Sequence, residues 1–341
     1  MLILGDLACP NSKCADLLIE DMKKYEFFKN NIILCNLEGM INDDEPYLDE
    51  KLFNHSKVLE AFSDKKTVFS LANNHTYDYP EQIENTENIL KMKNLYFNGI
   101  NHGLIVPTIV QENNTIYAIY THCWQVYTKT NPNRKNNQKI IDCSYKKFLN
   151  TVTDFIKKNP EIKVICYFHW NYDLETLPFP AYRKLAYQLI DDGVFAVIGN
   201  HAHLPQGGEI YKKHVIVYGL GNFYIPSGYF FNGKLSYPEQ SKKMLVLELC
   251  EDIDKVLCHW FITDGKESIQ LIKTERFIDG EIIAKYSPYR KMNNKEYLKF
   301  FKKNRVKRNL VPIFKEFQGV SYSINEFIAI SRIKIIKKIK Y

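Results

Sequence analysis

The stretch that decides the fold is FAVIGNHAH, residues 195–203, where a short apolar run ends in polar residues. Short apolar runs bounded by turn-forming residues are typical of buried strands. The histidines after this run, His201 and His203, are two residues apart and could present both imidazoles to one metal ion. The stretch alone leaves two interpretations open, a metal site and a pair of structural histidines.

The same arrangement occurs four more times, with apolar runs that end near residues 5, 35, 71 and 168. The polar side chains that follow are Asp6, Asn36, Glu38, Asn73, Asn74, His75, His169 and Trp170. Ligands of open α/β sheets bind beyond the carboxyl ends of the strands, so we expect five strand ends to bring these side chains together. Taken singly, each could be a turn, cap or core residue. Together, oxygen and imidazole ligands suit one or two divalent transition metals.

Strand and helix signals alternate over the first 200 residues, which favours an α/β core with parallel strands. Helices are expected at residues 15–28, 82–92, 144–158 and 180–192, and a β-hairpin at residues 105–110 and 115–120. Later strands are expected at residues 209–211, 214–218, 243–249, 256–263 and 268–272. We interpret these later strands as a second, antiparallel sheet.

Charge divides the chain into two parts. Residues 285–341 contain sixteen Lys or Arg and three Glu, a net charge of +13, whereas the whole chain carries +7 and residues 1–284 therefore −6. We predict one domain over residues 1–284 and a basic, mainly helical extension over residues 285–341. Such an extension is expected to meet an anionic partner: a membrane face, a polyanionic polymer or nucleic acid.

Composition also suggests a location. The eight cysteines include no C-x-x-C pair, and no apolar stretch approaches the length of a membrane span. No signal peptide precedes the first expected strand at residue 2, so we expect a cytoplasmic protein. Residues 322–341 end in Lys and Arg interleaved with Ile. This pattern is typical of a helix on the inner face of the membrane, and equally of a helix that packs its Ile face on the core.

Taken together, the motifs resemble the bacterial capsule-synthesis CapA family, also called poly-gamma-glutamate biosynthesis proteins. That family belongs to the metallo-dependent phosphatase (calcineurin-like) superfamily. The resemblance covers residue 1 to about residue 225. It rests on Gly5-Asp6, Asn36-Leu37-Glu38, Leu71-Ala72-Asn73-Asn74-His75 with Asp78, His169-Trp170, Gly199-Asn200-His201-Ala202-His203 and Tyr218-Gly219-Leu220-Gly221-Asn222-Phe223. The resemblance implies a metallophosphatase-like four-layer α/β/β/α sandwich.

The resemblance also implies roles for individual residues. Glu38 would bridge two metal ions, with Asp6 and His203 at one and Asn74, His169 and His201 at the other. The catalytic residues would be His75, as general acid, and Asp173, which would orient a ligand histidine; Asn73, Trp170 and Asn222 would shape the substrate pocket. The ligand types favour Mn, Fe or Zn, because imidazole is a poor partner for Mg²⁺ and Ca²⁺.

The chain departs from the family pattern at two places, and with the family it departs from the wider superfamily at a third. Asn171 and Asp173 stand where the family usually has Gly and Glu. Asn200 and Ala202 interrupt the usual histidine-rich triplet, and no His follows Asp6 as it does in the wider superfamily. The expected occupancy is therefore one or two divalent ions.

Two functions from different classes follow. The first is a metal-dependent phosphoesterase-like hydrolase of capsule, polysaccharide or other surface-polymer biosynthesis, with an anionic polymer or phosphoester as substrate. The alternative is a non-catalytic accessory protein that binds an anionic polymer or a membrane-bound synthase through its basic C-terminus. A nuclease would also suit the metals, but the chain shows no recognition motif of interleaved aromatic and basic residues, so no specific nucleic acid is expected.

Overall fold

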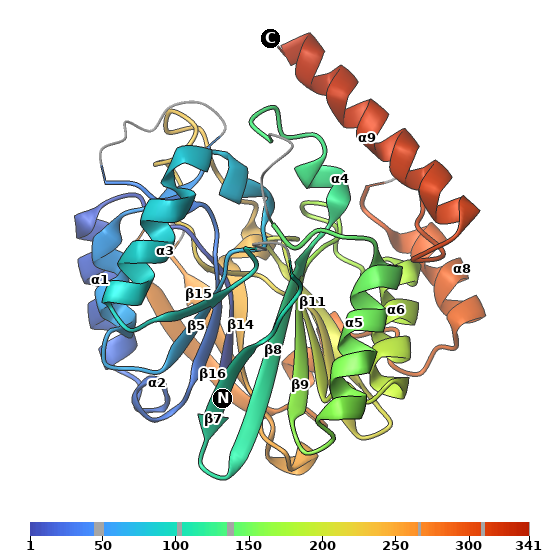
Figure 1. Ribbon diagram of the computed structural model, residues 1–341, viewed down its shortest axis with the longest axis horizontal. Coiled ribbons are helices and arrows are strands. Elements are labelled where there is room, and N and C mark those ends of the chain that lie inside the picture. The colour runs from blue at the N-terminus through green and yellow to red at the C-terminus, as the bar shows by residue number, and fades with distance from the viewer. Residues whose placement is uncertain (44–50, 101–103, 135–139, 265–266, 308–310, 341) are drawn as a thin grey trace.

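The computed structural model describes residues 1–43, 51–100, 104–134, 140–264, 267–307 and 311–340. Two mixed β-sheets face each other, and helices cover the outer face of each (Figure 1). The order of strands in the first sheet is β16-β15-β14-β1-β2-β5-β6, and β13 also pairs with β1. The order in the second sheet is β11-β12-β10-β9-β8-β7.

The first sheet joins parallel and antiparallel strands at β1. Strands β1, β2, β5 and β6 are parallel to one another, and β14, β15 and β16 continue the sheet antiparallel from β1. Their bounds are β1 Leu2–Leu7, β2 Ile33–Leu37, β5 Thr67–Ser70, β6 Tyr96–Asn98, β13 Asn222–Tyr224, β14 Lys243–Glu248, β15 Leu257–Thr263 and β16 Ile269–Arg276. A small separate pair is formed by β3 Met40–Ile41 and β4 Phe53–Asn54.

The second sheet has a parallel centre with an antiparallel strand at each edge. Strands β8, β9, β10 and β12 are parallel, whereas β7 and β11 run antiparallel to β8 and β12. The bounds are β7 Thr108–Glu112, β8 Thr115–Cys123, β9 Lys163–His169, β10 Ala196–Asn200, β11 Pro205–Tyr211 and β12 His214–Leu220. The expected hairpin is thus confirmed as β7–β8, although its first strand begins only at Thr108.

Side-chain caps mark the beginning of some of the helices. Ser144 caps α5 by accepting a hydrogen bond from the Lys147 amide, and Asn293 forms a capping box with Glu296 at α8. The helical bounds are α1 Ser12–Lys23, α2 Phe27–Asn30, α3 Ile83–Met92, α4 Gln125–Thr128, α5 Tyr145–Lys158, α6 Pro180–Asp191, α7 Glu281–Tyr286, α8 Asn294–Asn304 and α9 Val320–Lys340. The 3-10 turns are η1 Ser56–Phe62, η2 Asn74–Tyr77, η3 Pro80–Gln82, η4 Glu239–Lys242 and η5 Ile253–Lys255.

Alternation along the strands separates three apolar layers. In β1, Leu2 and Leu4 pack toward α1, η1 and α3, whereas Ile3 lies in the layer between the two sheets. On the other side, Phe168 of β9 packs toward α5 and α6. Successive strand residues point to opposite faces, so each sheet is buried on both sides. The predicted four-layer α/β/β/α sandwich is therefore confirmed.

Two predictions about the elements are wrong. The strands after residue 209 do not form a sheet of their own, because β11 and β12 complete the second sheet and β14–β16 extend the first. The long-range pairing of Leu2 with Glu248 and of Ile3 with Leu247 places β14 beside β1. The helix expected at residues 15–28 ends at Lys23, and the short helix α2 follows it.

Residues beyond 284 pack against the second sheet's helix layer. Tyr289, Tyr297, Phe301, Phe314 and Phe317 belong to the same apolar cluster as α5 and α6. Helices α8 and α9 lie in the region predicted to be basic and mainly helical, and the domain boundary after residue 284 stays a prediction. Within the described part of the chain, no helix is both long enough and apolar enough to cross a membrane.

Candidate metal centre

Loops and strand ends of both sheets meet at one place and carry the predicted metal ligands. Asp6 lies near the end of β1, Glu38 directly follows β2, and His169 is the last residue of β9. Asn74 opens the 3-10 turn after β5, and His201 and His203 follow β10. Register aligns these ends: Asp6 lies opposite Asn36, and Asn200 opposite His169. The five strand ends are thus brought together, but they belong to two facing sheets.

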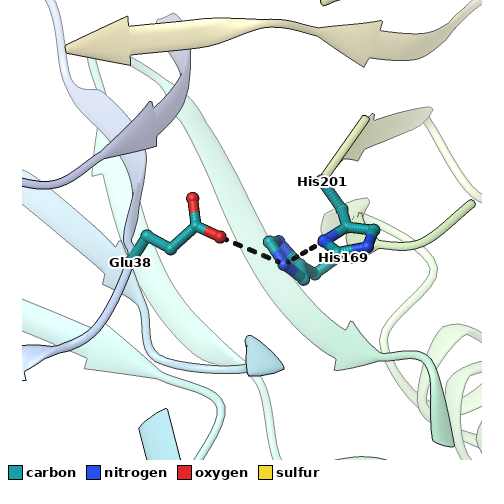
Figure 2. Close-up of side chains that lie close together, drawn as sticks. All are labelled: Glu38, His169 and His201. Atoms are coloured by element: carbon teal, nitrogen blue, oxygen red, sulfur yellow. Dashed lines mark hydrogen bonds and ion pairs between the residues drawn. The ribbon is translucent and has the colours of Figure 1, made fainter. Parts of the chain in front are cut away.

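One group of side chains converges on His169. The Nε2 atom of His169 is 2.7 Å from Asn74 Oδ1 and 2.9 Å from His201 Nδ1. Glu38 points at the same atom, with Oε1 3.6 Å from His169 Nε2 (Figure 2). Glu38, His169 and His201 are near enough to one another to bind a single metal ion.

A second group lies around Asp6 and His203. Asp6 Oδ2 is 3.6 Å from His203 Nδ1, and Glu38 Oε1 is 3.9 Å from His203 Nε2. Asp6 is held by the Asn36 side chain, which donates to Oδ1 at 2.8 Å, and by the His201 amide, which donates to Oδ2 at 3.1 Å. Asp6, Glu38 and His203 could hold one metal ion, and Asp173, His201 and His203 form a further such group. Glu38 is common to the first two groups and lies where a bridging ligand is expected.

The electrostatics of Glu38 fit a bound cation. Glu38 is completely buried, and neither of its carboxylate oxygens accepts a hydrogen bond from the described residues. Burial and the nearby carboxylates raise the pKa of Glu38 well above its usual value. A buried carboxylate without donors is costly unless a cation compensates it. Glu38 therefore fits a divalent metal ion better than any role in packing.

The histidines have the protonation state that metal binding requires. Burial, reinforced by neighbouring histidines, lowers the pKa of His169 well below its usual value, and burial lowers the pKa of His201 to about 3. Both rings are therefore neutral near pH 7, and neutral imidazole is the form that binds metals. His201 and His203 also adopt left-handed backbone conformations, with φ of 86° and 56°. Such strain in non-glycine residues is typical of functional sites.

The predicted catalytic residues border a cavity of about 340 Å³. His75 and Asp173 line it together with Asn74, His203, Tyr127 and Tyr237. Asp78 Oδ2 is 2.6 Å from His75 Nδ1, while His75 Nε2 is 3.9 Å from Glu38 Oε1. Asp173 Oδ1 is 3.3 Å from His203 Nε2, although the Asp173 side chain remains 55% exposed. Their roles as acid and orienting group stay predictions.

The predicted pocket residues lie in different surroundings. Asn222 Oδ1 is 2.7 Å from His203 Nδ1, so Asn222 supports a candidate ligand. Asn73 is buried and donates to Asn36 Oδ1 and to the Leu37 carbonyl, which fixes the loop after β2. Trp170 is not among the cavity-lining residues; it stacks on Phe168 and Tyr182 in the core and donates to the Tyr218 carbonyl.

Three residues near the site were not among the predicted site residues. Asn36 holds Asp6 and lies 3.4 Å from His169 Nδ1 through its amide nitrogen. The ring of Tyr127 meets the edge of His201 at 4.3 Å between centroids, and Tyr237 lies 5.0 Å from His203. Asn36 is expected among the converging side chains, but the sequence assigns it no role; it lies within β2, two residues before Glu38. The two tyrosines carry no such local signal, because they come from α4 and from the loop before η4.

Comparisons with known proteins give a family and two relatives of this chain. The family model described as "Bacterial capsule synthesis protein PGA_cap" matches residues 15–227, a range that contains all predicted metal ligands except Asp6. The capsule biosynthesis protein CapA of Bacillus anthracis is 26% identical over 230 residues, which are 62% of this chain and 49% of the relative. The PGA biosynthesis protein CapA of Bacillus subtilis (strain 168) is 28% identical over 167 residues, which are 48% of this chain and 43% of the relative.

Solved structures with a related arrangement are distant. A putative 5′-nucleotidase from Staphylococcus aureus is 12% identical with a TM-score of 0.42, covering 82% of this chain and 54% of its own. A calcineurin-like phosphoesterase from Bacillus subtilis is 10% identical with a TM-score of 0.39, covering 88% of this chain and 98% of its own.

The family assignment therefore rests on the sequence comparisons. The aligned regions span about half or less of the two CapA proteins. The matching family model covers more than half of the present chain and includes the loops that carry Glu38, His169, His201 and His203. This chain belongs to the bacterial capsule synthesis protein family PGA_cap.

Proposed function

We propose that this protein is a metal-dependent phosphoesterase-like hydrolase that acts in capsule or surface-polymer biosynthesis. The observation that carries the proposal is Glu38, a buried carboxylate without hydrogen-bond donors that faces His169 and His203. Family membership supports the pathway, and the carboxylate, amide and imidazole ligands support Mn, Fe or Zn as the metal.

The residues of the metal centre would have separate roles. Asn74, His169 and His201 would hold one divalent ion, Asp6 and His203 would hold another, and Glu38 would bridge them. Divalent ions at such a site supply electrostatic stabilisation of the charge that develops on the phosphoryl oxygens. Asn222, beside Nδ1 of His203, would keep that ring oriented and leave Nε2 for the metal ion.

His75 is placed to act as a general acid. Asp78 holds the His75 Nδ1 side of the ring, while Nε2 is turned toward Glu38 and the cavity. A leaving oxygen bound in the cavity would meet this Nε2 atom. As a water oxygen bonds to phosphorus and the bond to the leaving oxygen breaks, His75 would protonate the leaving oxygen; Asp78 would stabilise the charged ring before that transfer.

We expect His75→Gln to lower kcat for a phosphoester of an unactivated alcohol, such as glycerol phosphate, by about 10²–10⁴-fold, the usual contribution of a general acid. The metal content should be unchanged, because His75 is not among the proposed ligands. Turnover is measured by release of inorganic phosphate after reconstitution with Mn²⁺, Fe²⁺ or Zn²⁺, and metal content by elemental analysis. His214→Gln is the matched control, since His214 contacts the Phe195 carbonyl at the start of β12.

Two outcomes would contradict this function. A wild-type protein that binds no metal at micromolar concentrations removes its basis. A protein that is loaded with metal but hydrolyses neither phosphomonoesters nor phosphodiesters would leave the accessory function as the better explanation.

The accessory function is favoured by one observation on α9. Several apolar side chains of this helix are exposed, among them Val320, Ile324, Phe327, Ile328 and Ile335. The helix also carries basic residues, and a basic helix with exposed apolar side chains is suited to an anionic membrane surface. In this role, the protein would attach to the membrane beside a synthase or its anionic polymer.

We expect Phe327→Asp to weaken sedimentation with vesicles that contain anionic lipid, because Phe327 is 71% exposed and the new charge opposes the surface. Met92→Asp is the control, since Met92 is 75% exposed on α3. Point variants are preferable to truncation after residue 284, because Phe314 and Phe317 belong to the core. Equal sedimentation of wild type and Phe327→Asp would count against membrane attachment through α9.

A further inference from the structure

A second cavity of about 550 Å³ lies beside the candidate metal centre. Its wall combines two basic residues, Lys307 and Arg332, with the aromatic rings of Tyr127 and Tyr172 and the aliphatic side chain of Ile333. Both basic residues come from the C-terminal region beyond the match to the family model. The cavity is therefore built jointly by the family domain and the C-terminal region.

The two cavities adjoin. Tyr127, Asp173 and Ile333 line both the 550 Å³ cavity and the 340 Å³ cavity that contains His75 and His203. Helices α4 and α9, which carry Tyr127 and Ile333, are in contact and lie side by side in Figure 1. A molecule bound at the metal centre could thus extend directly into the second cavity.

The two cations in this wall lack hydrogen-bond partners for their side chains. Lys307 and Arg332 are half-buried, and neither side chain makes a hydrogen bond or ion pair with the residues that the structure describes. The Nε atom of Arg332 is shielded from solvent and has no acceptor there. Among the described residues of this wall the carboxylate is Asp173, which lies against His203 and also interacts electrostatically with Lys307. Partly buried cations without partners are costly, and an anionic ligand would relieve that cost.

The backbone segments that carry both cations are held in place by hydrogen bonds. The Glu175 carboxylate accepts hydrogen bonds from the backbone amides of Val306 and Lys307, at 3.1 Å and 3.0 Å. Helix α9 is tied down by Tyr322, whose hydroxyl accepts from Trp124 Nε1 at 3.2 Å, and by Asn325, which donates to the Ile313 carbonyl. Because the backbone is already ordered, an anion that binds here has to order only the two side chains.

We propose that Lys307 and Arg332 form an anion subsite that binds a second anionic group of the substrate, a carboxylate or a phosphate, away from the reacting bond. The planar guanidinium of Arg332 suits two-point binding of either oxyanion. Tyr127, Tyr172 and Ile333 would pack against the carbon chain that links this group to the phosphoester. The subsite rests on the proposed hydrolase function and narrows its substrates to phosphoesters that carry a further negative charge.

Binding to the metal-free protein tests the subsite without relying on turnover. The probes are glutarate and inorganic phosphate, titrated calorimetrically into wild type, Arg332→Gln and Lys307→Gln after metal removal. We expect at least one probe to bind wild type and to bind each variant about tenfold or more weakly, as befits the loss of a charge-assisted hydrogen bond. The tighter probe identifies the oxyanion. Lys334→Gln is the matched control, because Lys334 is exposed on the same helix and does not line the cavity.

Two results would overturn the subsite: no binding of either probe to a folded wild-type protein, or an equal loss in Lys334→Gln. Kinetics add a separate readout. For a phosphoester with a remote carboxylate, Arg332→Gln should raise KM about tenfold at unchanged kcat, and should not affect p-nitrophenyl phosphate. Absence of any hydrolysis would contradict the hydrolase function alone, since the binding result still decides the subsite.

Discussion

Replacing Glu38 by Gln is expected to lower metal affinity by more than about 100-fold, since the loss of even an outer-shell partner of a metal ligand costs about 10–100-fold. Glu38 lies within 4 Å of nitrogen atoms on both His169 and His203. The change keeps the size of the side chain but removes the negative charge that compensates the metal ions. Elemental analysis and competition with a chromophoric chelator measure the effect.

The same substitution should stabilise the metal-free protein. The Glu38 carboxylate is fully buried and accepts no hydrogen bond from the described residues, so its charge opposes folding unless a cation is present. A neutral amide also lacks partners there, but it avoids the larger cost of a buried charge, so the free energy of unfolding of the metal-free protein should rise by about 1–3 kcal/mol. Adding metal should then stabilise wild type and leave the variant almost unchanged.

These opposite changes separate a metal ligand from a structural carboxylate. Glu248→Gln is the control, because Glu248 already has a partner in His259, at 2.9 Å, and should give no gain in stability. If Glu38→Gln destabilised the metal-free protein and kept wild-type metal affinity, Glu38 would be a structural residue and the proposed centre would lose its bridging ligand.

The site was largely predictable because its residues follow strands directly. Asp6, Glu38, His169 and His201 each stand at or just after the end of a buried apolar run, and strand ends converge at one edge whichever sheet holds them. Trp170 shows how adjacency in sequence can mislead. Alternation along the extended chain points His169 into the site and stacks Trp170 on Phe168, on the other side.

The remainder depended on long-range packing. No local sequence pattern indicates that β14 pairs with β1. This pairing follows from the burial of Leu245 and Leu247 between the two sheets. In the same way, the sequence indicates only that Lys307 and Arg332 belong to a basic region. Their place beside the metal centre follows from contacts with Glu175 and from the packing of α9.

Arg183→Ala is expected to lower the free energy of unfolding by about 3–5 kcal/mol, because it leaves the buried Glu209 carboxylate without its cationic partner. Arg183 and Glu209 are only 1% and 3% exposed at their side chains. Nε and Nη2 of Arg183 donate to the two carboxylate oxygens of Glu209, each at 2.8 Å, and Nη2 also donates to the Tyr289 carbonyl. The pair joins α6, β11 and the segment after α7.

The neighbouring residue supplies the control for denaturant unfolding. Lys184 forms a largely exposed pair with Glu316, so Lys184→Ala should change the free energy of unfolding by no more than about 1 kcal/mol. The hydroxyls of Tyr187 and Tyr218 also donate to Glu209. If Arg183→Ala lowered the free energy of unfolding by less than about 1 kcal/mol, these two hydrogen bonds would be enough to stabilise the buried Glu209 carboxylate without the arginine. Metal content of the folded variant should match wild type, because Arg183 contacts none of the candidate ligands. A folded Arg183→Ala protein that had lost its metal would instead mean that this buried pair sets the position of the loop after β10, and with it His201 and His203.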